Sequence, residues 1–193
     1  MQNRGYTAIE LLFAMGLSVT LGAVATPQLL TTVDEVRTAG AVRYLSTRLQ
    51  RARLDSVVRS TDVGLQFVGA GGGYTVGIYR DGNGNGIRSR DIQRGVDPLI
   101  GALERLPDLF AGVDFGALPG LPPVDPGGTP PGTDPIRLGS SNILTFTPLG
   151  TASTGSLYVR GRRNIQYVVR IVGETGKTRV LKFDAVSQQW KPS

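Results

Sequence analysis

The 193-residue chain contains neither cysteine nor histidine. Without cysteine it can form no disulfide bond and present no thiolate nucleophile, and it gives no indication of its redox compartment. Without histidine it lacks the usual general base, the commonest metal ligand and the side chain that titrates near neutral pH. Catalysis by a serine–histidine or cysteine–histidine pair is therefore excluded. The acidic residues are scattered along the chain, so we expect no enzymatic activity and no required cofactor.

The charged residues that are present are mostly basic. Lysine and arginine number 21 against 15 aspartates and glutamates, which gives a net charge of +6. Such a balance favours anionic partners such as nucleic acid or lipid headgroups, and it carries no information about the fold. With 40% hydrophobic residues the chain is expected to fold, and its length suits one domain of ordinary size.

The N-terminal region contains a long apolar run. Residues 6–30 are almost wholly apolar or small, and about 20 such residues suffice for a helix to cross a bilayer. Arg4 precedes the run, and Asp34 and Glu35 follow it, which predicts a cytoplasmic N-terminus. Glu10 lies inside the run, where a carboxylate is costly and indicates function or a partner. An ordinary signal peptide cleaved within residues 23–26 is the alternative, but it leaves Glu10 unexplained.

The segment Gly5-Tyr6-Thr7-Ala8-Ile9-Glu10-Leu11-Leu12 resembles the prepilin leader motif of type IV pilins and type II secretion pseudopilins. The resemblance implies that residues 1–5 are a leader, and that a prepilin peptidase cuts between Gly5 and Tyr6 and then N-methylates Tyr6. Glu10 and Pro27 then become the fifth and twenty-second residues, where the family has a glutamate and often a proline. Tyr6 departs from the family's usual phenylalanine but keeps an aromatic ring.

The resemblance also implies roles for two residues of the transmembrane and assembly helix, residues 6–33. In a filament, the N-terminal amine of one subunit would pair with the Glu10 carboxylate of its neighbour. Removing one partner of such a buried ion pair typically costs about 3–5 kcal/mol. Pro27 lacks an N–H group and clashes with the preceding turn, so we expect it to kink or locally unwind the helix.

Residues 34–60 are predicted to continue the helix in amphipathic form. An apolar or small face recurs at three- and four-residue steps: Val33, Val36, Gly40, Ala41, Tyr44, Leu45, Leu49, Ala52 and Ser56. The other face carries arginines: Arg37, Arg43, Arg48, Arg51, Arg53 and Arg59. A helix laid on a sheet with a solvated charged face explains this pattern, and a surface for anionic lipid or nucleic acid is the alternative.

Residues 61–193 are predicted to form a globular β-rich domain. Strands are expected where β-branched or alternating segments are separated by glycine and proline: 63–68, 74–79, 143–147, 156–160, 165–172 and 178–184. Hairpin turns are expected at Gly71-Gly72-Gly73 and at 173–176. The Gly/Pro loop, residues 112–135, is expected to be an exposed, partly extended excursion between strands.

Three segments of the chain resemble GspH/FimT-type minor pilins and pseudopilins: 51–60, 146–157 and 175–180. Together with the leader motif, this resemblance implies an α+β fold, in which a long N-terminal helix packs on small antiparallel β-sheets.

A candidate calcium loop follows the second predicted strand. Asp81-Gly82-Asn83-Gly84-Asn85-Gly86-Ile87 matches the first half of a calcium-binding loop, so Asp81, Asn83 and Asn85 are candidate side-chain ligands and Ile87 a carbonyl ligand. The glutamate expected at position twelve is absent, and Asp91 or Asp97 would have to replace it. A plain turn is the alternative, because Asp-Gly and Asn-Gly pairs favour positive φ angles.

The C-terminal quarter contains candidate DNA-binding residues in two short motifs, Gly161-Arg162-Arg163 and Gly176-Lys177-Thr178-Arg179. They resemble the glycine–arginine pattern that some minor pilins use in DNA uptake, except that Lys177 replaces the first arginine. Phosphate contacts of this kind are sensitive to salt and independent of sequence. Solvated strand edges are the alternative.

The resemblance implies a structural subunit, a minor pilin or pseudopilin, of a type IV pilus or type II secretion filament. Its expected partners are other pilins, the prepilin peptidase and the bacterial inner membrane. It would cross that membrane once with its C-terminal domain in the periplasm, and then join a periplasmic or surface filament. A DNA-binding minor pilin for natural transformation is the alternative.

Overall fold

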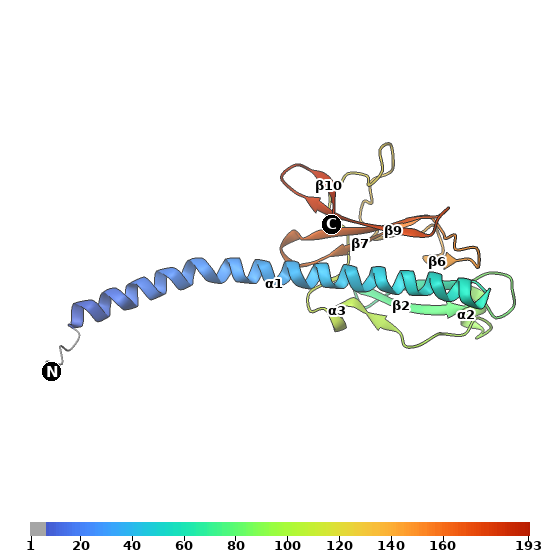
Figure 1. Cartoon of the computed structure of the whole chain (residues 1–193), viewed down its shortest axis with the longest axis horizontal. Coiled ribbons are helices and arrows are strands. Elements are labelled where there is room, and N and C mark those ends of the chain that lie inside the picture. The colour runs from blue at the N-terminus through green and yellow to red at the C-terminus, as the bar shows by residue number, and fades with distance from the viewer. Residues whose placement is uncertain (1–6) are drawn as a thin grey trace.

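The computed structural model describes residues 7–193, and Gly5 and Tyr6 lie outside this range. A single helix, α1 (Ala8–Arg59), spans 52 residues and is about 78 Å long at 1.5 Å per residue. Its N-terminal half projects from the body of the protein, and its C-terminal half lies between two β-sheets (Figure 1). The α+β fold with a long N-terminal helix on antiparallel sheets is therefore confirmed.

The first sheet has four strands in the order β3-β2-β1-β6. Their bounds are β1 (Val63–Ala70), β2 (Gly73–Arg80), β3 (Glu104–Arg105) and β6 (Ile143–Phe146). Gly71 and Gly72 close the β1–β2 hairpin with φ angles of 58° and 83°, which only glycine adopts readily in succession. The hairpin predicted at this glycine run is confirmed.

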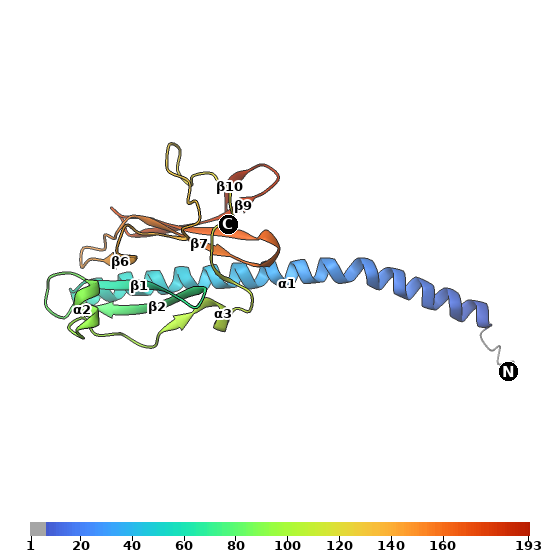
Figure 2. The same ribbon diagram turned by 180° about the vertical axis from the view of Figure 1, so that it is seen from behind.

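The second sheet has six strands. Five follow the order β10-β9-β8-β7-β4, and β5 pairs with β7 beside β4. The bounds are β4 (Asp114–Phe115), β5 (Ile136–Arg137), β7 (Gly155–Arg160), β8 (Gln166–Val172), β9 (Lys177–Asp184) and β10 (Gln189–Pro192). Two short helices, α2 (Ser89–Gln93) and α3 (Leu106–Leu109), and a 3-10 turn, η1 (Arg162–Asn164), complete the described chain. Figure 2 shows the first sheet from behind, with the second sheet on the other side of the helix.

The main core fills the space between α1 and the two sheets. The helix contributes Ala41, Leu45, Leu49 and Ala52, as the amphipathic pattern predicts, and also Val42, which the predicted face did not include. The predicted face is wrong at its N-terminal end, where Val36 is 65% exposed while Asp34 and Thr38 are buried. On this turn of the helix Asp34 faces Arg163 of η1, the turn between β7 and β8.

The Gly/Pro loop, residues 112–135, packs against the outer face of the second sheet and is not a free excursion. Leu121 joins Tyr158, Val168 and Leu181 in a second, smaller core. The Trp190 Nε1–H group donates to the Pro122 carbonyl at 3.0 Å. The buried Gln166 amide donates to the Gly116 carbonyl and accepts from Leu118 N–H, so polar contacts as well as apolar ones hold the loop.

Candidate functional site

The N-terminal half of α1 presents its apolar side chains to the surroundings. Ile9 and Phe13 are about three-quarters exposed, and Leu12 and Val19 are nearly as open. Among residues 7–193, α1 is the one helix long and apolar enough to cross a membrane, by length and composition. An apolar surface of this extent on a folded chain indicates contact with lipid or with another protein.

Thr7 and Glu10 form a capping box at the start of α1. The Glu10 Oε2 atom accepts hydrogen bonds from Thr7 N–H and Thr7 Oγ1–H, both at 2.8 Å. In return, Thr7 Oγ1 accepts from Glu10 N–H at 3.4 Å. The carboxylate thus caps its own helix in the isolated chain, which satisfies two polar hydrogens at the exposed helix end. The Glu10 carboxylate therefore already accepts hydrogen bonds within the isolated chain.

Gly5 and Tyr6, the predicted cleavage and methylation positions, lie outside the described residues. Helix α1 continues without interruption through position 27, and its axis curves along this half (Figure 1). The backbone is therefore not unwound at this position, and a kink caused by Pro27 stays a prediction.

Two ion pairs join α1 to the second sheet just beyond the apolar run. Arg163 Nε lies 3.6 Å from Asp34 Oδ2, and Lys182 Nζ pairs with Glu35. The hydrogen bond to Glu35 raises the pKa of Lys182 above its ordinary value, despite the opposing effect of burial. From the sequence, Asp34 and Glu35 were identified only as the charges that follow the apolar run. Their partners could not be predicted, because Arg163 and Lys182 lie more than 100 residues further along the chain. We refer to these two pairs as the helix clamp.

The candidate calcium loop is organised by Asp81. Its Oδ1 atom accepts hydrogen bonds from Asn83 N–H and Gly84 N–H, and its Oδ2 atom accepts from Gly86 N–H. Ile87 packs its side chain over Gly64 of β1. These contacts are typical of a turn in which an aspartate side chain caps the backbone N–H groups that follow it.

Two further aspartates complete this loop. Asp91 accepts a hydrogen bond from Asn85 Nδ2 at 3.2 Å, and Asp97, which is 1% exposed, accepts from Gly82 N–H and Arg88 N–H. Among residues 7–193, no three acidic side chains cluster closely enough to suggest a metal site. The amide contacts favour the turn, and calcium binding stays a prediction that a melting curve with and without chelator would test.

We expect Asp81→Asn to destabilise the protein in a pH-dependent way. Burial raises the pKa of Asp81, but the backbone N–H groups of residues 83–86 outweigh it, so the pKa lies below its ordinary value. A lowered pKa stabilises the fold above the unfolded-state value, near pH 4, and this contribution is lost as pH falls through the folded-state value. In urea denaturation of the detergent-solubilised chain, the gap between wild type and variant should therefore be largest near neutral pH and close below about pH 4. Asp108→Asn, at an exposed position of α3, is the control, and an Asp81→Asn gap that does not change with pH would refute this role.

The candidate DNA-binding residues lie at opposite ends of the globular domain. Arg163 is part of the helix clamp and also donates to Thr31 Oγ1, and Arg162 precedes it in η1. Lys177 lies in a groove with Gln50 and Val57, near the end of α1. About 20 residues of helix separate the two places, or roughly 30 Å. The structure therefore does not bring the two motifs into one contact.

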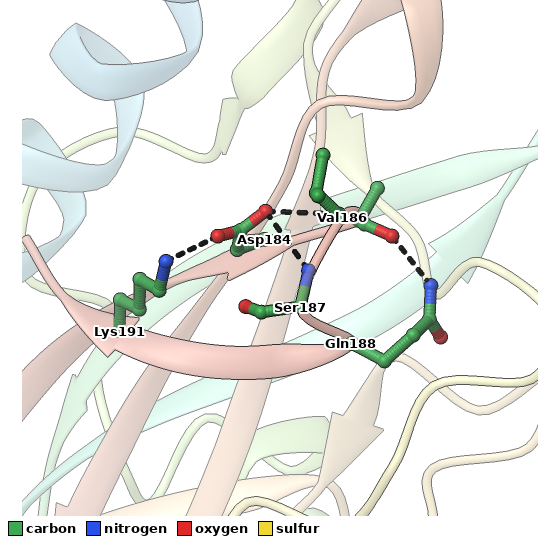
Figure 3. Close-up of polar contacts among 6 residues, drawn as sticks. Asp184, Val186, Ser187, Gln188 and Lys191 are labelled. Carbon is green, nitrogen blue, oxygen red and sulfur yellow. Dashed lines mark hydrogen bonds and ion pairs between the residues drawn. The ribbon is translucent and has the colours of Figure 1, made fainter.

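Other basic residues of the C-terminal quarter are locally paired. Lys191 on β10 pairs with Asp184, and the same carboxylate accepts hydrogen bonds from Val186 N–H and Ser187 N–H in the β9–β10 turn (Figure 3). The hydrogen bond from Lys191, followed by those from the β9–β10 turn, holds the pKa of Asp184 well below its usual range. Lys191 thus has an internal partner and contributes less to any anion-binding surface.

The three segments that resemble GspH/FimT-type proteins meet around Arg53. Its Nε–H group donates to the Gly150 carbonyl at 2.9 Å, and its side chain also packs against Gly176. Ser56 Oγ donates to the Thr147 carbonyl at 3.0 Å. A Cβ atom on Gly176 would come within 2.3 Å of the Gly150 carbonyl oxygen, so this approach requires glycine. The sequence alone indicated the three segments but not their contact.

Comparison with known proteins gives one informative match. The chain is 33% identical over 127 residues to "Pilin-like protein PilA1" of Thermus thermophilus, and the match covers 57% of this chain and 77% of that protein. No family model and no solved structure matches. This identity, over most of the length of the relative, is high enough to show common membership of one family. The chain therefore belongs to the type IV pilin-like protein family.

Proposed function

We propose that the protein is a structural, non-catalytic subunit of a type IV pilus or type II secretion filament, as a minor pilin or pseudopilin of the GspH/FimT type. The observation that carries the proposal is the division of α1. Its C-terminal half buries one face against its own domain, while its N-terminal half exposes an apolar surface with a single carboxylate, Glu10. Such a surface needs a bilayer before assembly and neighbouring helices afterwards. The convergence of the three resembling segments around Arg53 supports the subtype.

The proposal includes a location and a maturation step. The chain crosses the bacterial inner membrane once through residues 6–33, with the globular domain in the periplasm, and then enters a periplasmic or surface filament. Prepilin peptidase cuts between Gly5 and Tyr6 and methylates Tyr6. Other pilins then pack against the exposed half of α1.

Coexpression with a prepilin peptidase tests maturation directly. We expect the intact mass of the full chain to fall by residues Met1–Gly5 and to rise by one methyl group, because the peptidase performs both reactions. Expression without the peptidase is the control and should leave the mass unchanged. An uncut chain, or a cut within residues 23–26, would refute the pilin maturation.

A DNA-binding minor pilin is the alternative, and the exposed Lys177 and Arg179 on β9 favour it. The two residues are two positions apart in the strand and therefore lie on the same face, so a single phosphate backbone can reach both. This function would appear as salt-dependent retention of DNA by the purified full chain, lost in a Lys177→Gln, Arg179→Gln variant. Retention that instead depends on Arg162 and Arg163 would place the contact at the other end of the domain.

A further inference from the structure

A polar pocket lies between the Gly/Pro loop and the outer face of the second sheet. Its volume is about 200 Å³, and its lining includes Asp125 and Thr129 of the loop with Arg137, Ser156, Tyr158 and Arg170 of the sheet. Two guanidinium groups and three hydroxyl groups thus surround one small cavity. None of these residues belongs to the assembly helix or to the two DNA-binding motifs.

The strand register brings the arginines of the pocket into one row. Arg137 on β5 is opposite Ser156 on β7, Ser156 is opposite Arg170 on β8, and Arg170 is opposite Arg179 on β9. Side chains directly opposite each other project from the same face of a sheet, and like charges in such positions repel. Arg170 and Arg179 are like charges in such positions, so an anion bound over the row would be attracted by both.

The contacts inside the pocket leave positive charge unmatched. Arg170 Nη2 pairs with Asp125 Oδ2 at 2.7 Å, and Arg170 Nη1 donates to the Gly155 carbonyl at 3.0 Å. Arg137 Nη1 reaches only the Pro130 and Pro131 carbonyls, both at 3.4 Å. Asp125 is the one carboxylate that lines the pocket, against two guanidinium groups. A group with two negative charges would match both arginines.

The Asp125 carboxylate is positioned so that an incoming anion could replace it at Arg170. Its side chain is 44% exposed and lies on a loop, whereas the side chain of Arg170 is only 22% exposed and lies on a central strand. A partly exposed ion pair of this kind contributes little to stability. An incoming oxyanion can therefore take the place of the carboxylate at Arg170 without rearranging the sheet.

The hydroxyl groups suit the same ligand. Burial raises the pKa of Tyr158, even though Arg137 and Arg170 oppose the shift, so its phenol remains a donor at neutral pH. Ser156 Oγ lies 3.4 Å from Arg170 Nη1. A tetrahedral oxyanion can accept several hydrogen bonds from guanidinium and hydroxyl groups at once, whereas a carboxylate offers only two oxygens.

We propose that this pocket binds a phosphate group, which competes with Asp125 for Arg170. The phosphate replaces the carboxylate at Arg170, pairs with Arg137 and accepts hydrogen bonds from the hydroxyls beneath the loop. The inference does not depend on assembly into a filament.

Isothermal titration of the full chain in a non-ionic detergent, with inorganic phosphate as the probe, tests the site. We expect Asp125→Asn to bind phosphate about three- to tenfold more tightly than wild type, because the variant removes the competing carboxylate. Arg137→Gln and Arg170→Gln should each lose binding. Lys191→Gln, which removes one positive charge elsewhere on the same sheet, should bind as wild type does.

The controls separate this site from general charge attraction. Sodium acetate at equal ionic strength should compete weakly, and a phosphodiester should bind less tightly than phosphate if two negative charges are required. Equal loss of binding in Lys191→Gln and Arg137→Gln, or unchanged affinity in Asp125→Asn, would overturn the proposal. Thermal melts establish that each variant is folded, and Arg137→Lys, which retains the charge, should recover part of the binding. Tighter binding of a DNA oligonucleotide than of phosphate, dependent on Lys177, would assign the arginine row to DNA instead.

Discussion

Replacing Glu10 by glutamine should abolish incorporation of the protein into filaments while leaving the helix capped. Glutamine can still accept the hydrogen bonds from Thr7 that the carboxylate accepts at 2.8 Å. It has no charge with which to pair the amine of a neighbouring subunit. Loss of one partner of a buried ion pair costs about 3–5 kcal/mol, or roughly two orders of magnitude or more in an assembly equilibrium. The amount of subunit in sheared filament fractions, relative to the amount in the membrane, measures this effect.

Thr7→Val is the matched control for Glu10→Gln. Valine removes the hydroxyl that completes the capping box and keeps the Glu10 charge, so assembly should be nearly normal. The opposite pattern, in which Glu10→Gln assembles and Thr7→Val does not, would show that Glu10 acts by capping its own helix. Both variants must first reach the membrane and be cleaved in normal amounts.

Gln166→Leu should give the largest loss of stability of any single substitution outside the main apolar core. The side chain is 1% exposed, and its Nε2 group donates to the carbonyls of Gly116, Val159 and Tyr167 at 3.0–3.1 Å. Its Oε1 atom accepts from Leu118 N–H at 3.0 Å. Leucine fills a similar volume but leaves the Gly116 carbonyl and the Leu118 N–H group, which lie outside the β7–β8 ladder, without this partner, at about 1–3 kcal/mol for each group that water cannot reach. We expect a total loss of about 3–5 kcal/mol in chemical denaturation.

The same variant should release the Gly/Pro loop. Because Gly116 and Leu118 lose their contact with β8, limited proteolysis should cut between residues 116 and 135 faster than in wild type. Gln189→Leu, at an exposed position of β10, is the control and should alter neither stability nor cleavage. An unchanged cleavage rate in Gln166→Leu would mean that the apolar contacts of Leu121 and Trp190 alone hold the loop.

The long helix and the six main strands could be predicted because each carries a local pattern. The 3.6-residue period of Ala41, Leu45, Leu49 and Ala52 requires a partner surface along one face of a helix. Alternation with β-branched residues does the same for the strands, and the glycine run at residues 71–73 predicted its hairpin. Three elements of only two residues, β3, β4 and β5, carry no such pattern, because their conformation is imposed by the strands they pair with.

The order of the Gly/Pro loop could not be predicted for a related reason. Its proline and glycine content indicates an absence of regular structure, which is correct, but irregular does not mean unpacked. The contacts that hold it come from Gln166 and Trp190, at least 40 residues further along the chain. Likewise, Val36 was predicted to be a core residue because it fits the apolar period of the helix. The ion pair between Asp34 and Arg163, which lies far along the chain, could not be seen in that local pattern.

The candidate sites divide in the same way. Glu10 could be identified from its surroundings alone, since a carboxylate within an apolar run is exceptional. The two arginine motifs are as plain in sequence as Glu10, yet their separation depends on where the strands end. The phosphate pocket had no sequence motif, because its arginines come from β5 and β8 and meet only through the register of the sheet.

The helix clamp has a mechanical consequence. Asp34 and Glu35 end the apolar run and also pair with Arg163 and Lys182 of the globular domain, so α1 continues from the apolar stretch into the domain as one helix. If filament growth draws the helix out of the bilayer, each residue withdrawn lifts the whole domain by about 1.5 Å. The helix and the domain would then move together, so a force applied to the N-terminal half of α1 would be transmitted directly to the globular domain.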